Sequence, residues 1–563
     1  MSNISILDKI SQTVNNQSDK WWRYAVIYQV YPRSFMDSNG DGIGDLQGII
    51  QKLDYLVSLS VDAIWISPFF KSPMKDFGYD ISDYCAIEPM FGTIDDFRQL
   101  LNEAHKRELK IIIDQVWNHT STEHPWFIES SQSREHPKAD WFVWADAKTD
   151  GSPPNNWQSA FGGSAWAWHP QRQQYYLHNF LPEQADLNWY NPEVVEAILD
   201  TARFWLDLGV DGFRLDVINF LTHDRQLRDN PMRPNNVRRP EGASMNDPFF
   251  SQINLYNFCR PETIDVLEKI RQVIDSYPGT TTLAEISSAE DAILTSSEYV
   301  QGNQRLQMAY NSSLMTEEAL TSTRLQQIIE RVENYFSSND GVICWTAGTH
   351  DFPRLKSRWR QFLIDDDFTH EAFDHMFAAL LICLRGSCCI YQGDELGLTQ
   401  AIIPYEKMKD PFGLAGYPDI LGRDGCRTPM PWQKESVNAG FTNAEEAWLP
   451  LPDEHYLHAV DQQEKNPNSL LNKYRRLISW RKKQPALLTG ELILVDTPEP
   501  LFAFERKCEQ QHLLCVFNLS PMPVHYDLSS YPQCLEANES DFINRRYENT
   551  VEIPGYGVFF GLI

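Results

Sequence analysis

Short apolar runs alternate along the chain with longer segments in which apolar residues recur at every third or fourth position. The short runs predict β-strands at residues 26–31, 63–67, 110–116, 210–216, 280–285, 342–346 and 388–391. The longer segments predict amphipathic helices at residues 46–59, 94–107, 192–208, 261–277 and 371–384. Because strands and helices alternate, the sequence predicts an α/β fold with a parallel sheet.

The number of strand–helix units favours a closed (β/α)8 TIM barrel over an open doubly wound sheet. Seven or eight strands are expected, and no G-x-G-x-x-G sequence opens any of the helices. A dinucleotide-dependent enzyme is therefore not expected.

Two departures from this alternation predict further domains. Between residues 119 and 188, Pro, Gly, Asn and aromatic residues dominate, which predicts an irregular domain inserted after the third strand. From residue 488 onward, strict alternation predicts a C-terminal antiparallel β-sandwich domain. The expected division is a barrel of residues 1–118 and 189–487, an inserted domain of residues 119–188 and a C-terminal domain of residues 488–563.

Composition narrows the classes of partner and the compartment. The chain has 563 residues, 49 Lys and Arg against 77 Asp and Glu, and a formal net charge of −28, so nucleic acid and anionic membranes are disfavoured and a neutral substrate is expected. Its ten cysteines lack C-x-x-C spacing, which favours free thiols. No apolar stretch reaches the roughly 18 residues of a membrane span, and residues 1–20 do not resemble a secretory signal. A cytoplasmic protein is expected.

Three acidic residues follow predicted strands and point to chemistry. Asp216 ends the strand at residues 210–216, Glu285 ends the strand at residues 280–285, and Asp351 follows the strand at residues 342–346. A barrel gathers the carboxyl ends of its strands at one face, so these carboxylates are expected in one pocket. Carboxylates that share a pocket, one protonated and one ionised, are the working groups of a glycosidase.

Basic and imidazole side chains near these carboxylates extend the candidate site. Arg214 and Asp216 point to the same side of an extended strand, so Arg214 is expected to lower the pKa of Asp216 and keep it ionised, as a nucleophile requires. A purely structural ion pair is the alternative. His119 and His350 also follow predicted strands, where they can donate hydrogen bonds to sugar hydroxyls or simply satisfy the structure.

Residues 37–45 place carboxylate or amide oxygens at alternate positions, with glycines that allow the backbone to bend. The oxygen-bearing side chains are those of Asp37, Asn39, Asp41 and Asp45. An oxygen-rich loop of this kind suits Ca²⁺, although no glutamate stands at the twelfth position, where an EF-hand has one. The expectation is a structural Ca²⁺ site in which Mg²⁺ is an alternative ion. An Asx/Gly turn without an ion is the other interpretation.

Ordered motifs along nearly the whole chain resemble the α-amylase family of glycoside hydrolases (family 13). Besides residues 37–45, they lie at residues 26–35, 77–84, 391–397 and 422–432. Within that family the chain is most similar to the bacterial α-glucosidase and oligo-1,6-glucosidase branch. One departure is Thr349, because the family usually has Asn before the final His-Asp pair.

The resemblance implies a role for each candidate residue. Asp216 would be the nucleophile, Glu285 the acid/base and Asp351 the carboxylate that stabilises the transition state. The glucose subsite would be formed by Tyr79, His119, Arg214 and His350, with Asp76 and Arg423 closing its far end. The ion loop would use Asp37, Asn39, Asp41, Asp45 and the Ile43 carbonyl. Double displacement with retention requires the Asp216 and Glu285 carboxyls about 5 to 5.5 Å apart.

Two features of the resemblance disagree about the glycosidic linkage. Val217, which follows the nucleophile, tends to accompany α-1,6 cleavage in this branch. The long irregular stretch at residues 223–260 and the motif at residues 425–432 are more similar to enzymes of short α-1,4 substrates. Both linkages therefore stay open.

The function that the resemblance implies is an exo-acting, retaining α-glucosidase for maltose-, isomaltose- or sucrose-type α-glucosides, with transglucosylation to sugar or alcohol acceptors as a side activity. A sucrose isomerase or trehalose-forming transglucosidase is the enzyme alternative. A catalytically silent carbohydrate-binding protein is the third possibility. No organic cofactor is expected, and the sequence does not distinguish a monomer from a homodimer.

Overall fold

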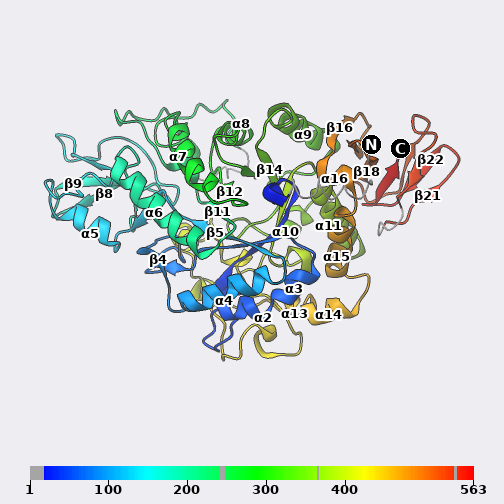
Figure 1. Cartoon of the computed structure of the whole chain (residues 1–563), viewed down its shortest axis with the longest axis horizontal. Helices are drawn as coiled ribbons and strands as arrows, with labels where there is room; N and C mark the ends of the chain where they lie inside the picture. Colours follow the sequence, from blue (N-terminus) through cyan, green and yellow to red (C-terminus); the bar gives the residue numbers. More distant parts are fainter. Residues whose placement is uncertain (1–17, 241–247, 364–366, 538–541) are drawn as a thin grey trace, which may run out of the picture.

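Eight parallel strands close into a barrel in the computed structural model, which describes residues 18–240, 248–363, 367–537 and 542–563 (Figure 1). In their order around the barrel the strands are β1 (Val26–Val30), β15 (Ser387–Tyr391), β14 (Val342–Thr346), β13 (Met308–Asn311), β12 (Thr281–Ala284), β11 (Gly212–Leu215), β5 (Lys110–Gln115) and β2 (Ala63–Ile66). The predicted TIM barrel is confirmed.

All seven predicted barrel strands are present, with ends that differ from the prediction by a few residues at most. The eighth strand, β13, was missed because its four residues Met308–Asn311 follow the polar Gln307 and include only two aliphatic side chains. Its backbone nevertheless pairs with both β12 and β14. Its burial comes from these neighbours and not from a local apolar run.

Helices surround the barrel and connect its parallel strands, and only some of them follow the predicted amphipathic segments. They are α2 (Leu46–Gln51), α3 (Leu53–Ser58), α4 (Ile94–His105), α6 (Pro192–Leu208), α7 (Thr263–Asp275), α8 (Ala292–Tyr299), α9 (Ser322–Phe336), α10 (Leu355–Arg360) and α11 (Asp367–Cys383). The helices α8, α9 and α10 were not predicted. The single helix expected at residues 46–59 is divided at Lys52, whose backbone is not helical (φ −108°, ψ 9°).

Local sequence signals set the ends of these helices. At the start of α6, the Asn191 side chain accepts a hydrogen bond from the Glu193 N–H, and Pro192 occupies the first turn. The helix ends at Gly209, which adopts φ 102°, a left-handed conformation that glycine tolerates. At the start of α4, Thr93 and Asp96 form a reciprocal capping box. These signals fix where α4 and α6 begin and where α6 ends.

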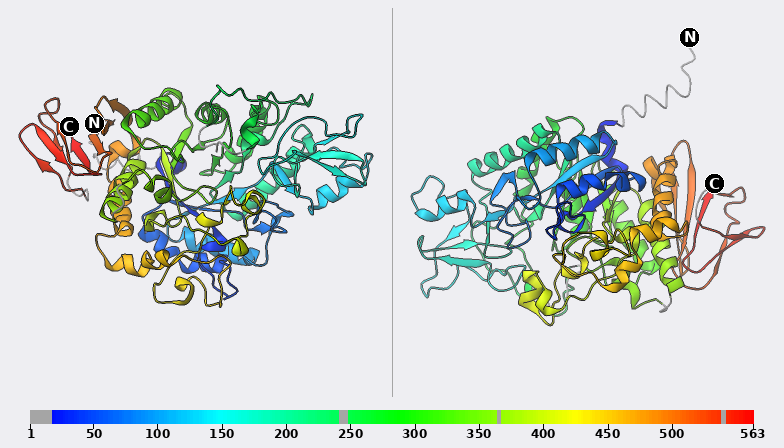
Figure 2. Two further views of the ribbon diagram at one scale, coloured as in Figure 1. Left: turned by 180° about the vertical axis from the view of Figure 1, so that it is seen from behind. Right: turned by 90° about the horizontal axis from the view of Figure 1, so that it is seen from below.

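The segment between β5 and α6 contains short antiparallel strands and one helix and forms one end of the molecule, in cyan in Figures 1 and 2. Its elements are β6 (His119–Ser121), α5 (Pro125–Gln132), β7 (Trp144–Ala145), β8 (Trp166–His169), β9 (Gln174–Leu177) and β10 (Gln184–Asp186). These strands form the sheets β10-β6 and β7-β9-β8. The irregular insertion after the third barrel strand is confirmed, whereas its limits as a domain stay a prediction.

The opposite end of the molecule is formed by C-terminal antiparallel strands, in red in Figures 1 and 2. The sheet β16-β17-β18-β23-β20 and the sheet β19-β22-β21 contain β16 (Glu491–Val495), β17 (Leu501–Lys507), β18 (His512–Asn518), β19 (Val524–Asp527), β20 (Leu535–Glu536), β21 (Arg545–Arg546), β22 (Thr550–Ile553) and β23 (Val558–Leu562). The predicted C-terminal antiparallel domain is confirmed.

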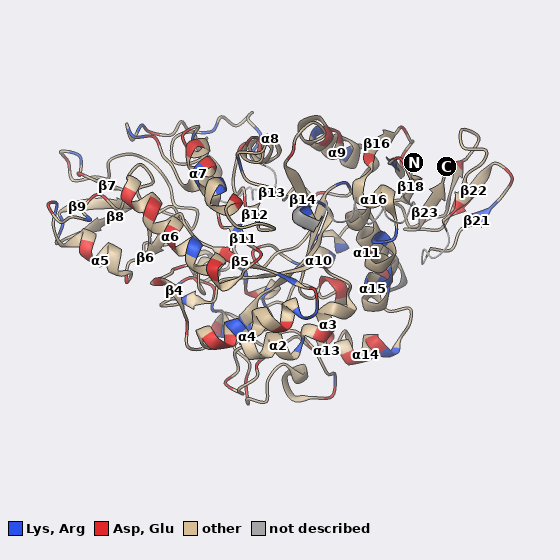
Figure 3. Ribbon diagram, viewed as in Figure 1, with Lys and Arg blue, Asp and Glu red and all other residues tan. Residues whose placement is uncertain are grey.

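The remaining helices connect the last barrel strand to the C-terminal sheets. They are α12 (Pro411–Gly416), α13 (Asp453–Leu457), α14 (Val460–Lys465), α15 (Leu470–Arg481) and α16 (Pro485–Thr489). In the part of the chain that the structure describes, no helix has the length and apolar character needed to cross a bilayer. Acidic side chains lie along the outer helices, among them α4, α6 and α7 (Figure 3), and all ten cysteines are free thiols.

Candidate active site

A single buried guanidinium, that of Arg214, contacts three carboxylates at the carboxyl end of the barrel. Arg214 Nη1 lies 2.8 Å from Asp114 Oδ1 and 2.6 Å from Asp216 Oδ1, and Nη2 lies 2.5 Å from Glu285 Oε2. The strand register explains the first contact, because Arg214 on β11 pairs with Asp114 on β5. The expected contact between Arg214 and Asp216 is therefore present, and Glu285 from the next strand joins it.

The electrostatics of Asp216 differ from the prediction. Burial raises the pKa of Asp216 well above its ordinary value; Arg214 opposes this effect, and the carboxylates of Glu285 and Asp114 add to it. Arg214 lowers the pKa of Asp216 as expected, but burial, the largest effect, outweighs it together with Glu285 and Asp114, so the net shift is upward. The site therefore favours the protonated form of Asp216 more than an exposed position would.

Glu285 is fixed by two further donors besides Arg214. The hydroxyl of Tyr310 donates to Glu285 Oε1 at 2.5 Å, and the backbone N–H of Val217 donates to Oε2 at 3.0 Å. Val217 has φ 35° and ψ 45°, a left-handed conformation that is rare for a β-branched residue. This turn directs the N–H of the residue after Asp216 onto Glu285, so Asp216 and Glu285 are positioned together.

Asp351 lies among cationic groups and is the most exposed of the three predicted catalytic residues, with 29% of its side chain exposed. Its Oδ1 lies 2.8 Å from Arg427 Nη2 and 3.5 Å from Arg423 Nη1. Burial raises the pKa of Asp351, but His350, Arg427 and Arg423 outweigh burial and hold this pKa below its usual range. Asp351 is therefore ionised throughout the neutral range.

The residue that departs from the family pattern, Thr349, supports Asp351 directly. The hydroxyl oxygen of Thr349 accepts a hydrogen bond from the backbone N–H of Asp351 at 3.2 Å. A side-chain oxygen two residues before an N–H forms a local turn that fixes the backbone. Thr349 thus holds the Asp351 backbone through its hydroxyl group.

His350 is stacked between two phenol rings. Its ring centroid lies 5.4 Å from that of Tyr79, with an interplanar angle of 6°, and 5.4 Å from that of Tyr31, with an angle of 19°. His350 Nε2 also lies 2.7 Å from the Tyr79 hydroxyl and 3.2 Å from Asp351 Oδ2. Burial lowers the pKa of His350 to about 3, so the imidazole is neutral at physiological pH.

An ion-pair group bounds the same site on another side. Arg423 Nη2 lies 2.6 Å from Asp76 Oδ1 and 2.7 Å from Asp410 Oδ1. Gln184 Nε2 donates to Asp76 Oδ2 at 3.2 Å and lies 3.0 Å from His119 Nε2. Burial lowers the pKa of His119 to about 4, so this imidazole is neutral as well.

These contacts join all the predicted catalytic and sugar-binding residues into one network. Arg423 links Asp76 to Asp351, which contacts His350. His350 contacts Tyr79, and the Tyr79 hydroxyl contacts Asp114. Arg214 then links Asp114 to Asp216 and Glu285. His119 joins the network because its Nε2 lies 3.0 Å from the Tyr79 carbonyl oxygen, and Val217 joins it at Glu285. A neutral substrate with several hydroxyls would meet fixed donors and acceptors throughout this network.

Comparison with known proteins agrees with this arrangement. The family model described as "Alpha amylase, catalytic domain" matches residues 29–490. The chain belongs to the alpha-amylase family. The family prediction is confirmed, and with it the prediction that the chain is a glycoside hydrolase.

Individual members of the alpha-amylase family match the chain over most of their length. A probable alpha-glucosidase of Rhizobium meliloti is 46% identical over 541 residues, covering 96% of each chain. An oligo-1,6-glucosidase of Heyndrickxia coagulans is 37% identical over 543 residues, covering 90% of this chain and 94% of the relative. The crystal structure of an alpha-glucosyl transfer enzyme is 48% identical, with a TM-score of 0.92 and coverage of 96% of this chain and 99% of that one.

The crystal structure of a trehalulose synthase shares the same fold. This enzyme, from Pseudomonas mesoacidophila, is 31% identical, with a TM-score of 0.85 and coverage of 96% of this chain and 99% of that one. The architecture of this alpha-amylase family member is thus common to proteins whose names describe hydrolysis and glucosyl transfer.

Several residues of this site were not predicted from the sequence. They are polar groups that contact the predicted ones, namely Tyr31, Asp114, Gln184, Tyr310, Asp410 and Arg427. The signal for Asp114 was present, because it is a carboxylate within the apolar run of β5 and pairs across the sheet with Arg214. Tyr310 carried no such signal, since it lies on the strand that was not predicted.

The predicted ion loop is a set of tight turns on the surface beside the barrel. Asp37 Oδ1 accepts from the N–H groups of Asn39 and Gly40, Asp41 Oδ1 accepts from the Ile43 N–H at 2.9 Å, and Asp45 Oδ1 accepts from the Gly48 N–H at the start of α2. Within the described residues, no group of three or more His, Cys, Asp or Glu side chains is gathered closely enough for a metal ion. The oxygen-only donor set still suits a hard cation, because an amide and a carbonyl oxygen can complete it.

Proposed function

We propose that the chain is a retaining, exo-acting α-glucosidase that releases α-glucose from the non-reducing end of short α-glucosides. The observation that carries this proposal is the bridge from Arg214 to both Asp216 and Glu285, with bonds of 2.6 and 2.5 Å. One guanidinium that bonds two carboxylates keeps them close, as the roughly 5 to 5.5 Å separation of a retaining glycosidase requires. That separation stays a prediction for the enzyme in its complex with substrate.

In the proposed mechanism, Glu285 acts as the acid and donates a proton to the glycosidic oxygen. Asp216 attacks the anomeric carbon at the same time, so the bond to the leaving group breaks and a β-linked glucosyl ester forms. Deprotonated Glu285 then removes a proton from water, the water oxygen attacks the anomeric carbon, and Asp216 leaves. Two inversions retain the α configuration.

The proposed roles of the other residues follow from their charge states. Asp351 is held ionised by its cationic neighbours and is suited to accept hydrogen bonds from sugar hydroxyls and to stabilise positive charge at the anomeric centre. Neutral His119 and His350 are suited to hydrogen-bond hydroxyls without adding charge. The buried Asp76–Arg423 ion pair is suited to close the subsite beyond one glucose unit, which would make the enzyme exo-acting.

A sugar or alcohol acceptor in place of water would give transglucosylation from the same ester. This side activity is supported by the similarity to the alpha-glucosyl transfer enzyme. A second candidate function, sucrose isomerisation, is supported by the similarity to the trehalulose synthase. Incubation with sucrose separates hydrolysis from isomerisation. Free glucose and fructose indicate hydrolysis, and an isomeric disaccharide indicates isomerisation.

Linkage preference is the main open part of the proposed function. The experiment is to compare kcat/KM for glucose release from maltose and from isomaltose under identical conditions. A preference for isomaltose would support α-1,6 specificity governed by Val217, whereas a preference for maltose would support α-1,4 specificity governed by the long loop. No measurable glucose release from maltose, isomaltose and sucrose would contradict the proposed α-glucosidase.

We further propose that the loop of Asp37, Asn39, Asp41, Asp45 and the Ile43 carbonyl binds a structural Ca²⁺, or Mg²⁺ in its place. The support is the oxygen-only donor set and the turns that bring these residues onto one loop. A cytoplasmic location and a monomeric or homodimeric state complete the proposal. Equilibrium sedimentation and localisation of the tagged protein would test these two points.

A further inference from the structure

A second pocket lies at the opposite end of the barrel from the carboxylate cluster. Its cavity of about 340 Å³ is lined by the 3-10 helix η1 (Ser18–Tyr24), the start of β14 and the residue before β15. Val342 is the first residue of β14, and Gly386 directly precedes β15, so the pocket opens at the amino ends of these strands. This volume is within the range of small-molecule sites, roughly 300 to 1,000 Å³.

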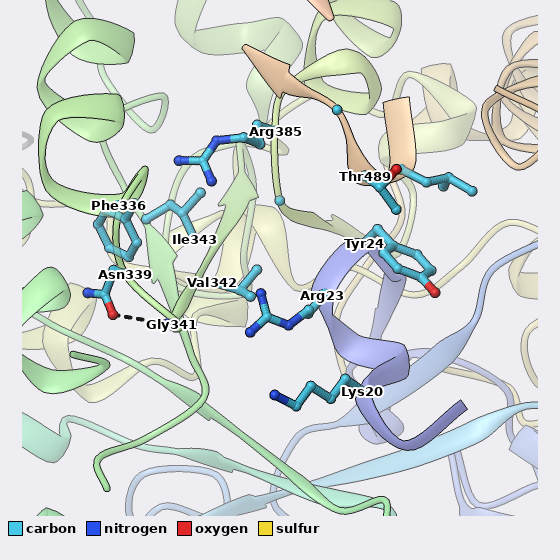
Figure 4. A pocket seen from close by; sticks show the side chains of 13 residues that line it. Lys20, Arg23, Tyr24, Phe336, Asn339, Gly341, Val342, Ile343, Arg385 and Thr489 are labelled. Atoms are coloured by element: carbon cyan, nitrogen blue, oxygen red, sulfur yellow. Dashed lines mark hydrogen bonds between the residues drawn. The ribbon is translucent and has the colours of Figure 1, made fainter. Parts of the chain in front are cut away.

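Cationic side chains surround this pocket. Lys20 and Arg23 approach it from η1, and Arg385 approaches it from the other side of Val342 and Ile343 (Figure 4). Among the described residues that line the pocket, none carries a carboxylate. Three cations that line one small cavity are unusual in a chain whose formal net charge is −28.

Two carboxylates behind the lining neutralise part of this charge. Glu333 accepts from Arg385 Nε at 2.9 Å, and Asp340 Oδ1 lies 3.6 Å from Arg23 Nη2. Arg385 contacts Glu333 through Nε, and neither of its Nη atoms has a hydrogen-bond partner among the described residues; Nη2 is buried, so Nη1 is the atom that a ligand could reach. Lys20 has no ion-pair partner in the described part of the chain. The pocket therefore keeps unused donors on two of its sides.

Two completely buried arginines behind the pocket wall add positive charge. Arg481 Nη2 donates to the Gly386 carbonyl at 2.8 Å, and Arg506 Nη2 donates to the Gly490 carbonyl at 3.0 Å; both glycines line the pocket. Neither arginine has an ion-pair partner among the residues that the structure describes. Burial, followed by the neighbouring charge of Arg481, lowers the pKa of Arg506 to about 10, so Arg506 is still charged at neutral pH.

We propose that this pocket binds a small phosphorylated molecule, with its phosphate between Arg385, Arg23 and Lys20. Guanidinium groups offer the paired donors that phosphate oxygens accept. The apolar part of the lining, which includes Tyr24, Phe336 and Leu488, is suited to contact the carbon skeleton of such a molecule. The proposal does not depend on the α-glucosidase activity, because the pocket and the carboxylate cluster share no residue.

The test is isothermal titration of the full-length protein with inorganic phosphate and with glucose 6-phosphate, and with glucose as the neutral control. We expect both anions to bind, with an affinity that falls as salt is raised, whereas heat from glucose in the proposed active site should not depend on salt or on the pocket variants below. Tighter binding of glucose 6-phosphate that is lost in the pocket variants would identify the organic phosphate as the ligand, and equal binding of the two anions would identify free phosphate. If neither anion binds at about 10 mM, a concentration at which even weak sites are occupied, the proposal is overturned.

Variants assign the binding to this pocket. The double change Lys20→Ala and Arg23→Ala should weaken phosphate binding by about 10-fold or more, the loss expected for charge-assisted hydrogen bonds. The matched control, Arg98→Ala on α4 with Lys106→Ala directly after it, removes one exposed Arg and one exposed Lys elsewhere and should leave binding unchanged. Arg385→Lys keeps the positive charge but removes the paired N–H donors of the guanidinium, so it should also weaken binding. Unchanged affinity in the folded pocket variants would overturn the proposal.

Discussion

The hydroxyl of Tyr310 donates a hydrogen bond of 2.5 Å to Oε1 of Glu285, the proposed acid/base. Tyr310 is completely buried against this site, and its hydroxyl also accepts from Arg214 Nη2 at 3.3 Å. Tyr310 therefore links the guanidinium that holds the carboxylates to one of the carboxylates itself. It is a positioning residue for Glu285.

Replacing Tyr310 with Phe should lower kcat by about 10-fold to 100-fold, since it removes the hydrogen bond to Glu285 and the one from the charged Arg214, and a hydrogen bond that involves a charged group contributes about 1.5 to 3 kcal/mol. KM for the same substrate should change less, because the lost bond orients the acid/base. The measurement is steady-state kinetics with a matched control, Tyr526→Phe, on a buried tyrosine of the C-terminal sheets. A KM effect with unchanged kcat would show that Tyr310 serves binding alone.

Replacing Asp216 with Asn should abolish turnover without lowering stability. Burial raises the pKa of Asp216 in the folded state. The free energy of unfolding therefore falls as pH rises from the unfolded pKa to the folded pKa of this carboxyl. An amide removes this penalty at pH 7, while Arg214 keeps Asp114 and Glu285 as partners.

Activity should fall by about 10³-fold or more, the loss expected when a nucleophile is removed. The Tm of the variant at pH 7 should equal or exceed that of the wild type. Retained activity would remove Asp216 from the nucleophile role, and a large drop in Tm would mean that its carboxylate stabilises the fold.

Replacing Val217 with Thr should raise the ratio of kcat/KM for maltose to that for isomaltose. Thr and Val have similar volume and both are branched at Cβ, so the left-handed backbone that directs the Val217 N–H to Glu285 should persist. The change adds a hydroxyl where the Val217 side chain packs with Phe220, Phe249 and Phe258. Parallel assays with maltose and isomaltose measure the ratio, and an unchanged ratio would discard Val217 as a determinant of linkage.

Much of the fold was predictable because its causes are local. Helix α6 was predicted at its observed limits, since Asn191, Pro192 and Gly209 mark its ends within a few residues of the chain. The strand that carries Arg214 was predicted from its own apolar run. The missed strand β13 has no such run, and only pairing with β12 and β14 makes it a strand. Its omission also concealed Tyr310.

The charge state of the site was not predictable from neighbours in sequence. Arg214 and Asp216 are two residues apart, and that spacing alone suggested a simple pair in which Arg214 lowers the pKa of Asp216. Burial of Asp216, together with Glu285 and Asp114 from other strands, outweighs Arg214 and makes the net shift upward. Contacts between distant residues decide pKa values, and the sequence does not list them.

His455 should contribute to loss of stability in acid. It is completely buried, and burial lowers its pKa to about 3, below the unfolded value of roughly 6.5. Between these two values the unfolded chain binds more protons than the folded chain, so the free energy of unfolding falls as pH falls. The limit is about 1.4 kcal/mol per pH unit.

The variant His455→Gln lacks this proton uptake. Whatever its stability at pH 7, its deficit relative to the wild type should shrink as pH is lowered from about 7 to 5. Denaturant unfolding at several pH values measures the difference, with His525→Gln as the control on an exposed histidine. A deficit that stays constant over this range would show that His455 does not take part in acid sensitivity.

The ion loop should couple metal binding to the wall of the candidate active site. Its Gly42 carbonyl accepts from the backbone N–H of Trp448 at 3.0 Å, and the backbone N–H of Asp37 donates to the Phe441 carbonyl at 3.1 Å. Trp448 in turn contacts Tyr31, the ring that stacks on His350, at a centroid distance of 6.2 Å. An ion that rigidifies the loop should therefore rigidify the support of His350.

Adding Ca²⁺ to the chelated protein should raise Tm, because a ligand that binds only the folded state stabilises it. The change Asp41→Asn keeps an oxygen that can accept from the Ile43 N–H but removes a negative charge, so it should reduce the Ca²⁺-dependent rise in Tm. The change Asp95→Asn on exposed α4 is the matched control and should leave that rise intact. If Tm does not respond to Ca²⁺ or Mg²⁺ in the wild type, the loop is an Asx/Gly turn that its own N–H groups hold together.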